Sequence, residues 1–217
     1  MHDEEIDDVV KILREECKRW RSPIVTEVSR ERIPFKVLIS CIISLRTKDE
    51  VTSEASRRLF SIADSPWKMA LLETDEIERA IYPAGFYRTK ARNIKRISHK
   101  LLEDNNGIVP DSLEELLKLP GVGRKTANLV MTLGYGKHGI CVDTHVHRIM
   151  NRLGYVSTKT PEQTEFVLRE KLPTQYWLEI NDLLVTYGQN LCTPVSPFCS
   201  RCRLYPYCQR VGVERSR

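Results

Sequence analysis

The sequence predicts an all-α protein, and three observations support this fold class. Apolar residues recur at helical spacing, as at Ile6, Val9, Val10, Leu13 and Cys17. Residues that favour helix starts and helix ends stand at the borders of such segments. Strands need an alternation of apolar and polar residues, and this pattern is almost absent. We therefore expect about ten helices of roughly 8 to 16 residues, joined by short turns.

The first half of the chain contains three informative segments. Residues 6–17 form the first predicted helix. The apolar run Val37–Leu45 is far shorter than the roughly 20 residues of a membrane span, so it predicts a buried helix. The segment 86–100 is either a phosphate-facing surface or a solvated helix face, and Asn105-Asn106-Gly107 is a stop signal. It carries six basic residues and no acidic residue: Arg88, Lys90, Arg92, Lys95, Arg96 and Lys100.

The second half of the chain contains further start signals. Asp111 precedes Glu114 by three residues and is expected to begin a helix. Residues 160–163 read as a capping box with proline at the first helical position. The apolar residues of 146–153 and 180–187 follow the helical period, so two more amphipathic helices are expected there.

Composition limits the class of protein. The chain has 217 residues, 41% of them hydrophobic and 29% charged, which is typical of a globular protein with one large core or two smaller ones. The net charge of +5 favours an anionic partner, although many enzymes have such a charge. We find no targeting segment, so the expected location is the cytoplasm of a prokaryote.

Four cysteines in a Cys-x6-Cys-x2-Cys-x5-Cys run predict a metal centre: Cys192, Cys199, Cys202 and Cys208. They share a loop with three prolines, where a core role is not expected. Disulfides are disfavoured because no signal peptide is found and three further thiols would remain. Spacing alone does not separate zinc from an iron–sulfur cluster. The remaining cysteines, Cys17, Cys41 and Cys141, are predicted to be small buried hydrophobes.

Residues 113–135 read as a helix, a glycine turn and a second helix that ends near Gly134–Gly136. The turn Gly121-Val122-Gly123 can leave backbone N–H groups facing outward, where they would bind a phosphate. A structural corner between two helices is the alternative for a bare Gly-x-Gly. Here Leu-Pro precedes the turn and Arg124-Lys125 follows it. This combination resembles the helix-hairpin-helix element of DNA-repair glycosylases.

Other segments extend the resemblance over nearly the whole chain. Val142-Asp143-Thr144-His145 is similar to the aspartate segment of the endonuclease III family, and the four cysteines have the spacing of its [4Fe–4S] loop. Ser44–Asp49 and Gly85–Lys90 also match. The resemblance implies the helix-hairpin-helix glycosylase fold, with two helical domains and a DNA cleft between them. One domain is expected to be a helical barrel over residues 27–136, and the other to join 1–26 to 137–217 and hold the cluster.

The resemblance also implies two catalytic residues. Lys125 matches the family's nucleophile and Asp143 its essential carboxylate; without the family pattern they would read as an exposed lysine and a helix N-cap. A helix from Arg124 to about Tyr135 spans roughly 18 Å, and the segment Gly136–Val142 can extend over about 23 Å. The chain can therefore return to bring Asp143 beside Lys125.

Lysine chemistry sets a requirement on this site. A lysine with an ordinary pKa of about 10.4 is neutral in only about four molecules in ten thousand at pH 7, so its pKa must be lowered. The helix dipole and Arg124 act in that direction, whereas an adjacent Asp143 carboxylate would act against it. We therefore expect Asp143 to act chiefly on the sugar, by stabilising positive charge at C1′.

The resemblance further implies DNA contacts: Gly121, Val122, Gly123, Arg124, Arg46, Phe86, Arg88, Lys90 and His145. Phe86 stands where the family places an apolar wedge, with a core phenylalanine as the alternative. Arg46 replaces the glutamine that commonly fills the gap left by a flipped base. The loop Thr193–Phe198 lacks the basic residues often found there, and Arg201, Arg203 and Arg210 are candidates to supply that charge.

The sequence thus predicts a monomeric, nucleoid-associated DNA glycosylase and abasic-site lyase with a structural [4Fe–4S] cluster. Its expected substrates are oxidised or otherwise damaged pyrimidines and abasic sites in double-stranded DNA. A glycosylase for thymine or uracil opposite guanine is the second hypothesis, favoured by Arg46. A non-catalytic DNA-binding protein with a zinc site is the third.

Overall fold

The computed structural model describes all residues 1–217, and every regular element in it is a helix. The chain forms two compact units, one of residues 1–23 with 138–217 and one of residues 24–137. The boundaries expected from the sequence, after residues 26 and 136, lie close to these. None of the helices combines the length and the apolar character that a membrane span requires.

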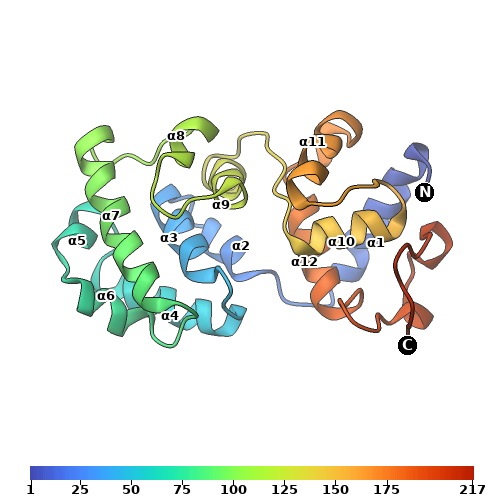
Figure 1. The fold of residues 1–217 in the computed structure, drawn as a ribbon, viewed down its shortest axis with the longest axis horizontal. Helices are drawn as coiled ribbons and strands as arrows, with labels where there is room; N and C mark the ends of the chain where they lie inside the picture. Colours follow the sequence, from blue (N-terminus) through green and yellow to red (C-terminus); the bar gives the residue numbers. More distant parts are fainter. The chain divides into compact units, whose positions relative to one another are not determined.

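The unit 24–137 contains eight α-helices (Figure 1). They are α2 (Ile24–Ser29), α3 (Pro34–Ser44), α4 (Asp49–Ile62), α5 (Pro66–Leu71), α6 (Thr74–Ile81), α7 (Tyr87–Asn105), α8 (Leu113–Leu117) and α9 (Arg124–Leu129). A π-helical segment, Val130–Gly134, continues α9, so the predicted helix after the glycine turn is confirmed. Helix α7 packs on α5 and α6, and α3 packs on α2, α4 and α9.

Helix α3 is the centre of this unit. Residues 37–43 are all buried, including Ser40 and Cys41, so the helix predicted from the apolar run is confirmed. A helix that is apolar on all sides is stable only when other helices surround it. The packing of α2, α4 and α9 on α3 meets that condition.

The unit 1–23 with 138–217 is built from α1 (Ile6–Cys17), α10 (Thr144–Leu153), α11 (Pro161–Lys171) and α12 (Ile180–Asn190). Short 3₁₀ turns stand at 3–5, 174–176, 199–201 and 205–207. The apolar face of α1 packs on α12, which also packs on α10. Ile6, Val9, Val10 and Leu13 are all buried, as their helical spacing predicts.

The start of α8 is capped by a different residue from the one predicted. Ser112, not Asp111, caps α8, because its Oγ accepts a hydrogen bond from the Glu115 N–H at 3.3 Å. The Asp111 carboxylate instead pairs with Lys137 Nζ at 2.5 Å. Because the Asp111 carboxylate is bound to Lys137, the Ser112 hydroxyl is the side chain that caps the helix.

The cap at residue 160 is confirmed in its first half. Thr160 Oγ1 accepts from the Gln163 N–H at 3.2 Å, whereas Gln163 Oε1 accepts from the Lys159 N–H at 2.9 Å rather than from Thr160. Helix lengths also depart from the expected range, since α7 has 19 residues and α8 has 5. The stop signal at the end of α7 is confirmed, with Asn106 in the left-handed region at φ 49°.

Candidate functional site

The glycine turn joins α8 to α9 as a tight hairpin. Leu119 and Val122 are buried, and the Val122 N–H donates to the Leu119 carbonyl at 3.2 Å, so this amide is used inside the turn. Gly121 has φ 77°, and a Cβ there would lie 2.5 Å from Asn93 Nδ2. Glycine is therefore required at 121 for its backbone angle and for the close approach of α7. Gly123 is the N-cap of α9.

Lys125 is the second residue of α9 and is half-buried. Its positive charge acts on Cys41 of α3 and favours the thiolate there, but burial has the larger effect and raises the pKa of Cys41 to about 12. Lys125 thus lies over the buried helix α3, at the start of the helix that follows the hairpin. Lys125 is therefore not a fully exposed lysine on a solvated helix face.

Asp143 belongs to the other unit, where it is the N-cap of α10. Its Oδ1 accepts hydrogen bonds from the N–H groups of His145 at 2.8 Å and Val146 at 3.0 Å, and the residue is 8% exposed. Two backbone donors on one carboxylate oxygen restrict the side chain of an N-cap residue. The carboxylate is therefore held in a defined position, whatever chemistry it takes part in.

His145 lies in the first turn of α10. Its Nδ1 stands 3.0 Å from Arg148 Nη2, and a guanidinium can only donate, so Nδ1 accepts and Nε2 carries the proton of the neutral ring. A ring N–H at Nε2 is a suitable donor to an anion. The same arginine donates to the carbonyl oxygens of Gly188 and Cys192.

Arg46 and Phe86 are adjacent in the unit 24–137. Both have left-handed backbones, at φ 52° and 57°, and both are exposed, Phe86 by 64%. The alternative of a core phenylalanine is therefore wrong. The Arg46 guanidinium lies over the Phe86 ring at 5.5 Å from its centroid. A cavity of about 300 Å³ opens beside them, with Gly121 of the hairpin in its wall.

Lys90 requires a correction. The sequence placed it among the DNA contacts, but it is only 4% exposed, and its Nζ donates to the carbonyls of Ile43 and Leu45, both at 2.6 Å, and to Thr47 Oγ1 at 2.8 Å. Burial lowers the pKa of Lys90 to about 8. An ammonium that is fully bonded inside the unit does not reach a phosphate.

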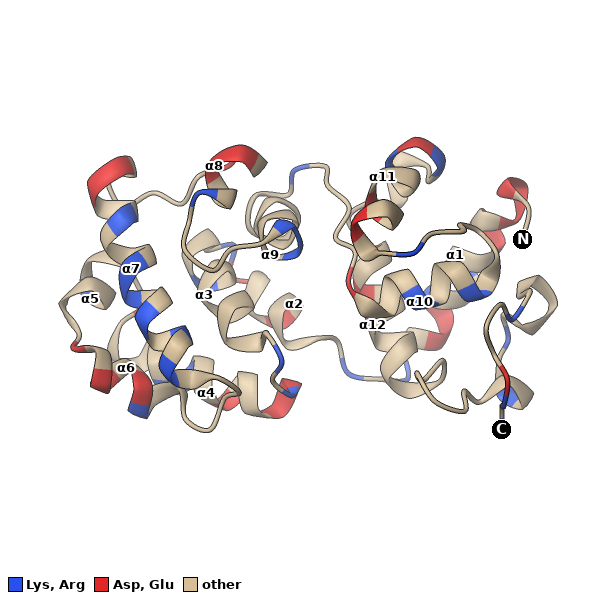
Figure 2. Ribbon diagram, viewed as in Figure 1, with Lys and Arg blue, Asp and Glu red and all other residues tan.

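Basic residues lie along much of α7 (Figure 2), and their contacts divide them into two groups. Lys95 and Lys100 pair with Glu73 and Asp104. Three exposed arginines stand four residues apart, on one helix face: Arg88, Arg92 and Arg96. Of these, Arg88 also lies 3.9 Å from the Glu78 carboxylate. The exposed positive charge on α7 is therefore carried by arginines, the first of which, Arg88, is two residues after Phe86.

The cysteine loop is held by side chains from α10 and α12. Arg152 is buried, and its guanidinium donates to the Thr193 and Pro194 carbonyls, both at 2.7 Å, and to Cys192 Sγ at 3.3 Å. Cys208 Sγ in turn donates to the Arg152 carbonyl at 3.3 Å. All four cysteines are free thiols and half-buried. No group of three or more side chains is assembled as a metal site.

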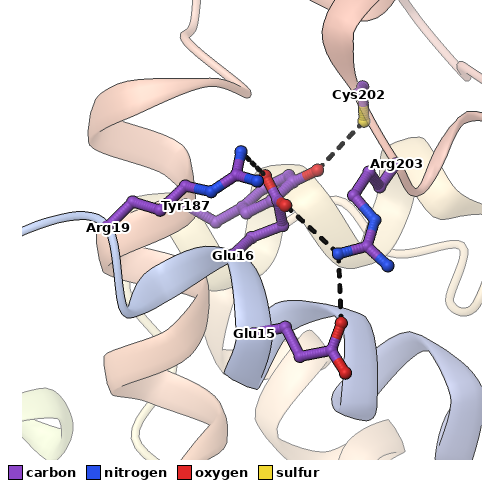
Figure 3. Close-up of polar contacts among 6 residues, drawn as sticks. All are labelled: Glu15, Glu16, Arg19, Tyr187, Cys202 and Arg203. Atoms are coloured by element: carbon purple, nitrogen blue, oxygen red, sulfur yellow. Dashed lines mark hydrogen bonds and ion pairs between the residues drawn. The ribbon is translucent and has the colours of Figure 1, made fainter.

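Tyr187 of α12 is fully buried, and its hydroxyl lies 3.1 Å from Cys202 Sγ (Figure 3). Nearby, buried Glu16 pairs with Arg19 and Arg203, and Arg203 also pairs with Glu15. Arg203 is therefore paired with α1, while about half of its side chain is exposed. Among the other cysteines, Cys41 and Cys141 are buried as predicted, whereas Cys17 is half-buried and donates to the Leu183 carbonyl at 3.4 Å.

The four thiols of the cysteine loop are ligands of the kind that zinc or an iron–sulfur cluster takes. Burial raises the pKa of Cys202 and of Cys208, so a metal centre would have to displace both protons. The Arg152 guanidinium and the Tyr187 hydroxyl, which already contact Cys192 and Cys202, are the kind of hydrogen-bond donors that stabilise ligand thiolates. Neither contact was predicted from the sequence: Arg152 reaches Cys192 from 40 residues before it, and Tyr187 reaches Cys202 from 15 residues before it.

Comparisons with known proteins identify the family. The profile of the HhH-GPD superfamily, described as base excision DNA repair proteins, matches residues 39–174. Endonuclease III of Thermotoga maritima is 49% identical over 180 residues, which is 83% of this chain and 84% of that protein. Endonuclease III of Bacillus subtilis is 35% identical over 85% of this chain and 84% of that protein.

A solved structure extends the match to nearly every residue. The structure of a trapped endonuclease III–DNA covalent intermediate superposes with a TM-score of 0.86 at 31% identity, covering 97% of both chains. The chain therefore belongs to the endonuclease III family, within the HhH-GPD superfamily of base excision DNA repair proteins.

Proposed function

We propose that this protein is a bifunctional DNA glycosylase and abasic-site lyase that acts on oxidised or otherwise damaged pyrimidines in double-stranded DNA. The observation that carries the proposal is Lys125, held at the start of α9 directly after the glycine hairpin, in a chain of the endonuclease III family. An amine so placed can act as a nucleophile beside a phosphate bound at the hairpin.

The proposed chemistry begins with a flipped nucleotide. The neutral Lys125 amine attacks C1′, and the bond from C1′ to the base breaks as the base leaves with a proton. Asp143 stabilises the positive charge that develops on the sugar. The nitrogen then forms a protonated imine with C1′ as the bond from C1′ to the ring oxygen O4′ breaks and O4′ takes a proton. Loss of a proton from C2′ then expels the 3′ phosphate by β-elimination.

The remaining proposed contacts divide by role. The hairpin residues Gly121–Arg124 and His145 bind the DNA backbone, and Arg88 adds charge at the start of α7. Phe86 wedges into the base stack, and Arg46 occupies the gap that the flipped base leaves. Two exposed side chains on left-handed turns, stacked on one another, support that assignment.

We further propose that Cys192, Cys199, Cys202 and Cys208 hold a [4Fe–4S] cluster. The proposed reaction needs no electron transfer, so the cluster would serve to order a loop that contains little apolar core. The protein as purified should be brown and absorb near 400 nm, with about four iron ions per chain. Stoichiometric zinc without iron would contradict the cluster.

Borohydride trapping tests the nucleophile. The unmodified protein should form a covalent adduct with abasic DNA in the presence of borohydride, and Lys125→Ala should form none. Lys118→Ala is the matched control, since Lys118 precedes the same turn and pairs with Glu114 and Glu115. An undiminished adduct in Lys125→Ala would remove that residue from the role. Absence of cleavage by the unmodified protein would leave a DNA-binding role only.

A second substrate class is favoured by Arg46, whose five N–H donors can pair with an orphaned guanine. Rates should be compared on duplexes with thymine glycol, dihydrouracil, uracil or thymine opposite guanine, and a bare abasic site. Faster removal of mismatched thymine or uracil than of thymine glycol would favour the mismatch glycosylase.

The proposed setting is the nucleoid of a prokaryotic cell, in the cytoplasm, with the protein acting as a monomer. The bacterial relatives support this setting. Sedimentation with and without duplex DNA should give one chain per lesion, and a dimer in either state would contradict the monomer.

A further inference from the structure

Lys90, in the unit 24–137, is a buried lysine that the proposed chemistry does not use. It lies on α7, while its three acceptors belong to the end of α3 and the turn after it: the Ile43 and Leu45 carbonyls and Thr47 Oγ1. An ammonium has three N–H donors, and each finds one of these acceptors. Lys90 therefore joins the start of α7 to the turn that carries Arg46.

The same network reaches the turn that carries Phe86. Thr47 Oγ1, which accepts from Lys90, also accepts from the Gly85 N–H at 3.1 Å. A Cβ at Gly85 would lie 2.6 Å from the Arg46 carbonyl oxygen, so the two turns are in direct contact. Lys90 and Thr47 thus connect the backbone on both sides of Arg46 to the residue before Phe86.

The two connected residues have backbones that side-chain-bearing residues rarely adopt. Arg46 and Phe86 both have positive φ, and such conformations persist only where the surroundings impose them. Their own side chains cannot supply that constraint, because both are exposed. Groups that bond to the backbone of the turns can do so, and buried Lys90 with half-buried Thr47 are the polar groups found there.

We propose that Lys90 is a positioning residue that presents Arg46 and Phe86 as one rigid wedge to stacked DNA. The inference rests on the proposed function, in which these two side chains open the base stack. Lys90 is then needed when a paired base must be turned out, and not when the damaged base is already unstacked. Burial disfavours the charged ammonium form of Lys90 and lowers its pKa to about 8.

The experiment compares two substrates under single-turnover conditions. One is a duplex with the damaged pyrimidine fully paired, and the other carries it in a short unpaired bubble, where flipping costs little. Lys90→Met, which keeps length but removes all donors, should slow the paired substrate by about 10- to 100-fold and the bubble by less than about threefold. A uniform loss of folded protein would lower both rates equally, so the ratio isolates positioning.

Thr47→Val and Lys95→Met complete the series. Thr47→Val keeps the Lys90 bonds to the two carbonyls but cuts the link to Gly85, so the paired substrate should slow by about 3- to 10-fold. If Lys90→Met does not fold, the Thr47→Val variant still tests whether this network positions the two turns. Lys95→Met removes a lysine of the same helix that pairs only at the surface, with Glu73, and should leave the ratio of the two rates unchanged.

An Arg46→Ala, Phe86→Ala double variant separates the two levels of the proposal. If it does not change the ratio of paired to bubble rates, the assigned wedge is wrong and the role of Lys90 falls with it. If it lowers the ratio while the Lys90 and Thr47 variants do not, the wedge stands and the inference about Lys90 is overturned. Equal losses on both substrates in Lys90→Met and Thr47→Val would likewise overturn it.

Discussion

The hairpin turn at 119–123 and the cysteine loop at 192–208 are both irregular, but different forces hold them. The hairpin buries its own apolar residues, Leu119 and Val122, beside the helices that it joins. The cysteine loop buries only Leu204 and Pro197 fully, and its backbone depends on Arg148 and Arg152 of α10. A turn with local apolar contacts is held by its own residues, whereas a loop without them depends on side chains from other elements, here those of α10.

The comparison has a consequence for the proposed carboxylate. Asp143 caps the same helix, α10, whose Arg148 and Arg152 hold the cysteine loop. Disorder in the loop should therefore disturb α10 and, with it, the position of the Asp143 carboxylate. Lys125, on the helix after the hairpin, has no such link within its unit.

The largest expected effect separates the two roles of Asp143. Asp143→Asn keeps an N-cap acceptor but removes the charge, so base removal should fall by about 10²- to 10³-fold with little change in thermal stability. Asp143→Ala should show the same loss of rate and, in addition, a loss of about 0.5–2 kcal/mol in unfolding free energy. Single-turnover kinetics and thermal melts measure both. Full activity in Asp143→Asn would reduce the residue to a helix cap.

Removing Arg152 tests how the loop is held. Arg152→Met leaves two carbonyls and Cys192 Sγ without their donor, and should cost about 2–4 kcal/mol of unfolding free energy and hasten bleaching near 400 nm. Arg201→Met is the matched control, because Arg201 is exposed and lies over the Phe198 ring, so its loss should change stability by less than about 0.5 kcal/mol. Equal effects of the two changes would contradict the comparison drawn above.

The buried charge of Lys90 predicts a pH dependence of stability. Its pKa falls from 10.5 to about 8 on folding, so between these values the unfolded chain binds more protons and stability rises with pH. Relative to Lys90→Met, the unfolding free energy should therefore rise by about 2 kcal/mol from pH 7 to pH 9.5. Arg46 is the other charged residue that lines the adjacent cavity. Denaturant unfolding of both proteins at each pH measures the difference, and a constant difference would mean that Lys90 titrates normally.

The smallest effect concerns the two glycines of the hairpin. Gly121→Ala puts a Cβ against Asn93 at a positive φ, and should cost about 1–2 kcal/mol of stability. A Cβ at Gly123 meets nothing within 4 Å, and its φ is −100°, so Gly123→Ala should change stability by less than about 0.5 kcal/mol. Gly123→Ala should nevertheless weaken binding to abasic DNA, if the backbone there approaches a phosphate. Chemical unfolding and DNA titration separate these results.

Local patterns in the sequence determined the helices, the hairpin and the residues to watch. The apolar run of α3, the helical spacing of α1 and the Gly121–Gly123 turn are set by neighbours within a few positions, so their structure could be predicted. The candidate residues Lys125, Asp143 and the four cysteines came from motif spacing together with the family resemblance.

Only the tertiary structure decided what the individual polar side chains do. Lys90 and Arg88 look alike in the sequence, yet Lys90 reaches carbonyls about 45 residues away along the chain, whereas Arg88 is exposed. Arg152 and Tyr187 likewise contact the cysteine loop from other helices. Helical periodicity reports which face of a helix is apolar, but a long side chain at the edge of that face can turn inward or outward. A long side chain turns inward only where buried acceptors lie within hydrogen-bonding distance, and the packing of the helices decides where those acceptors lie.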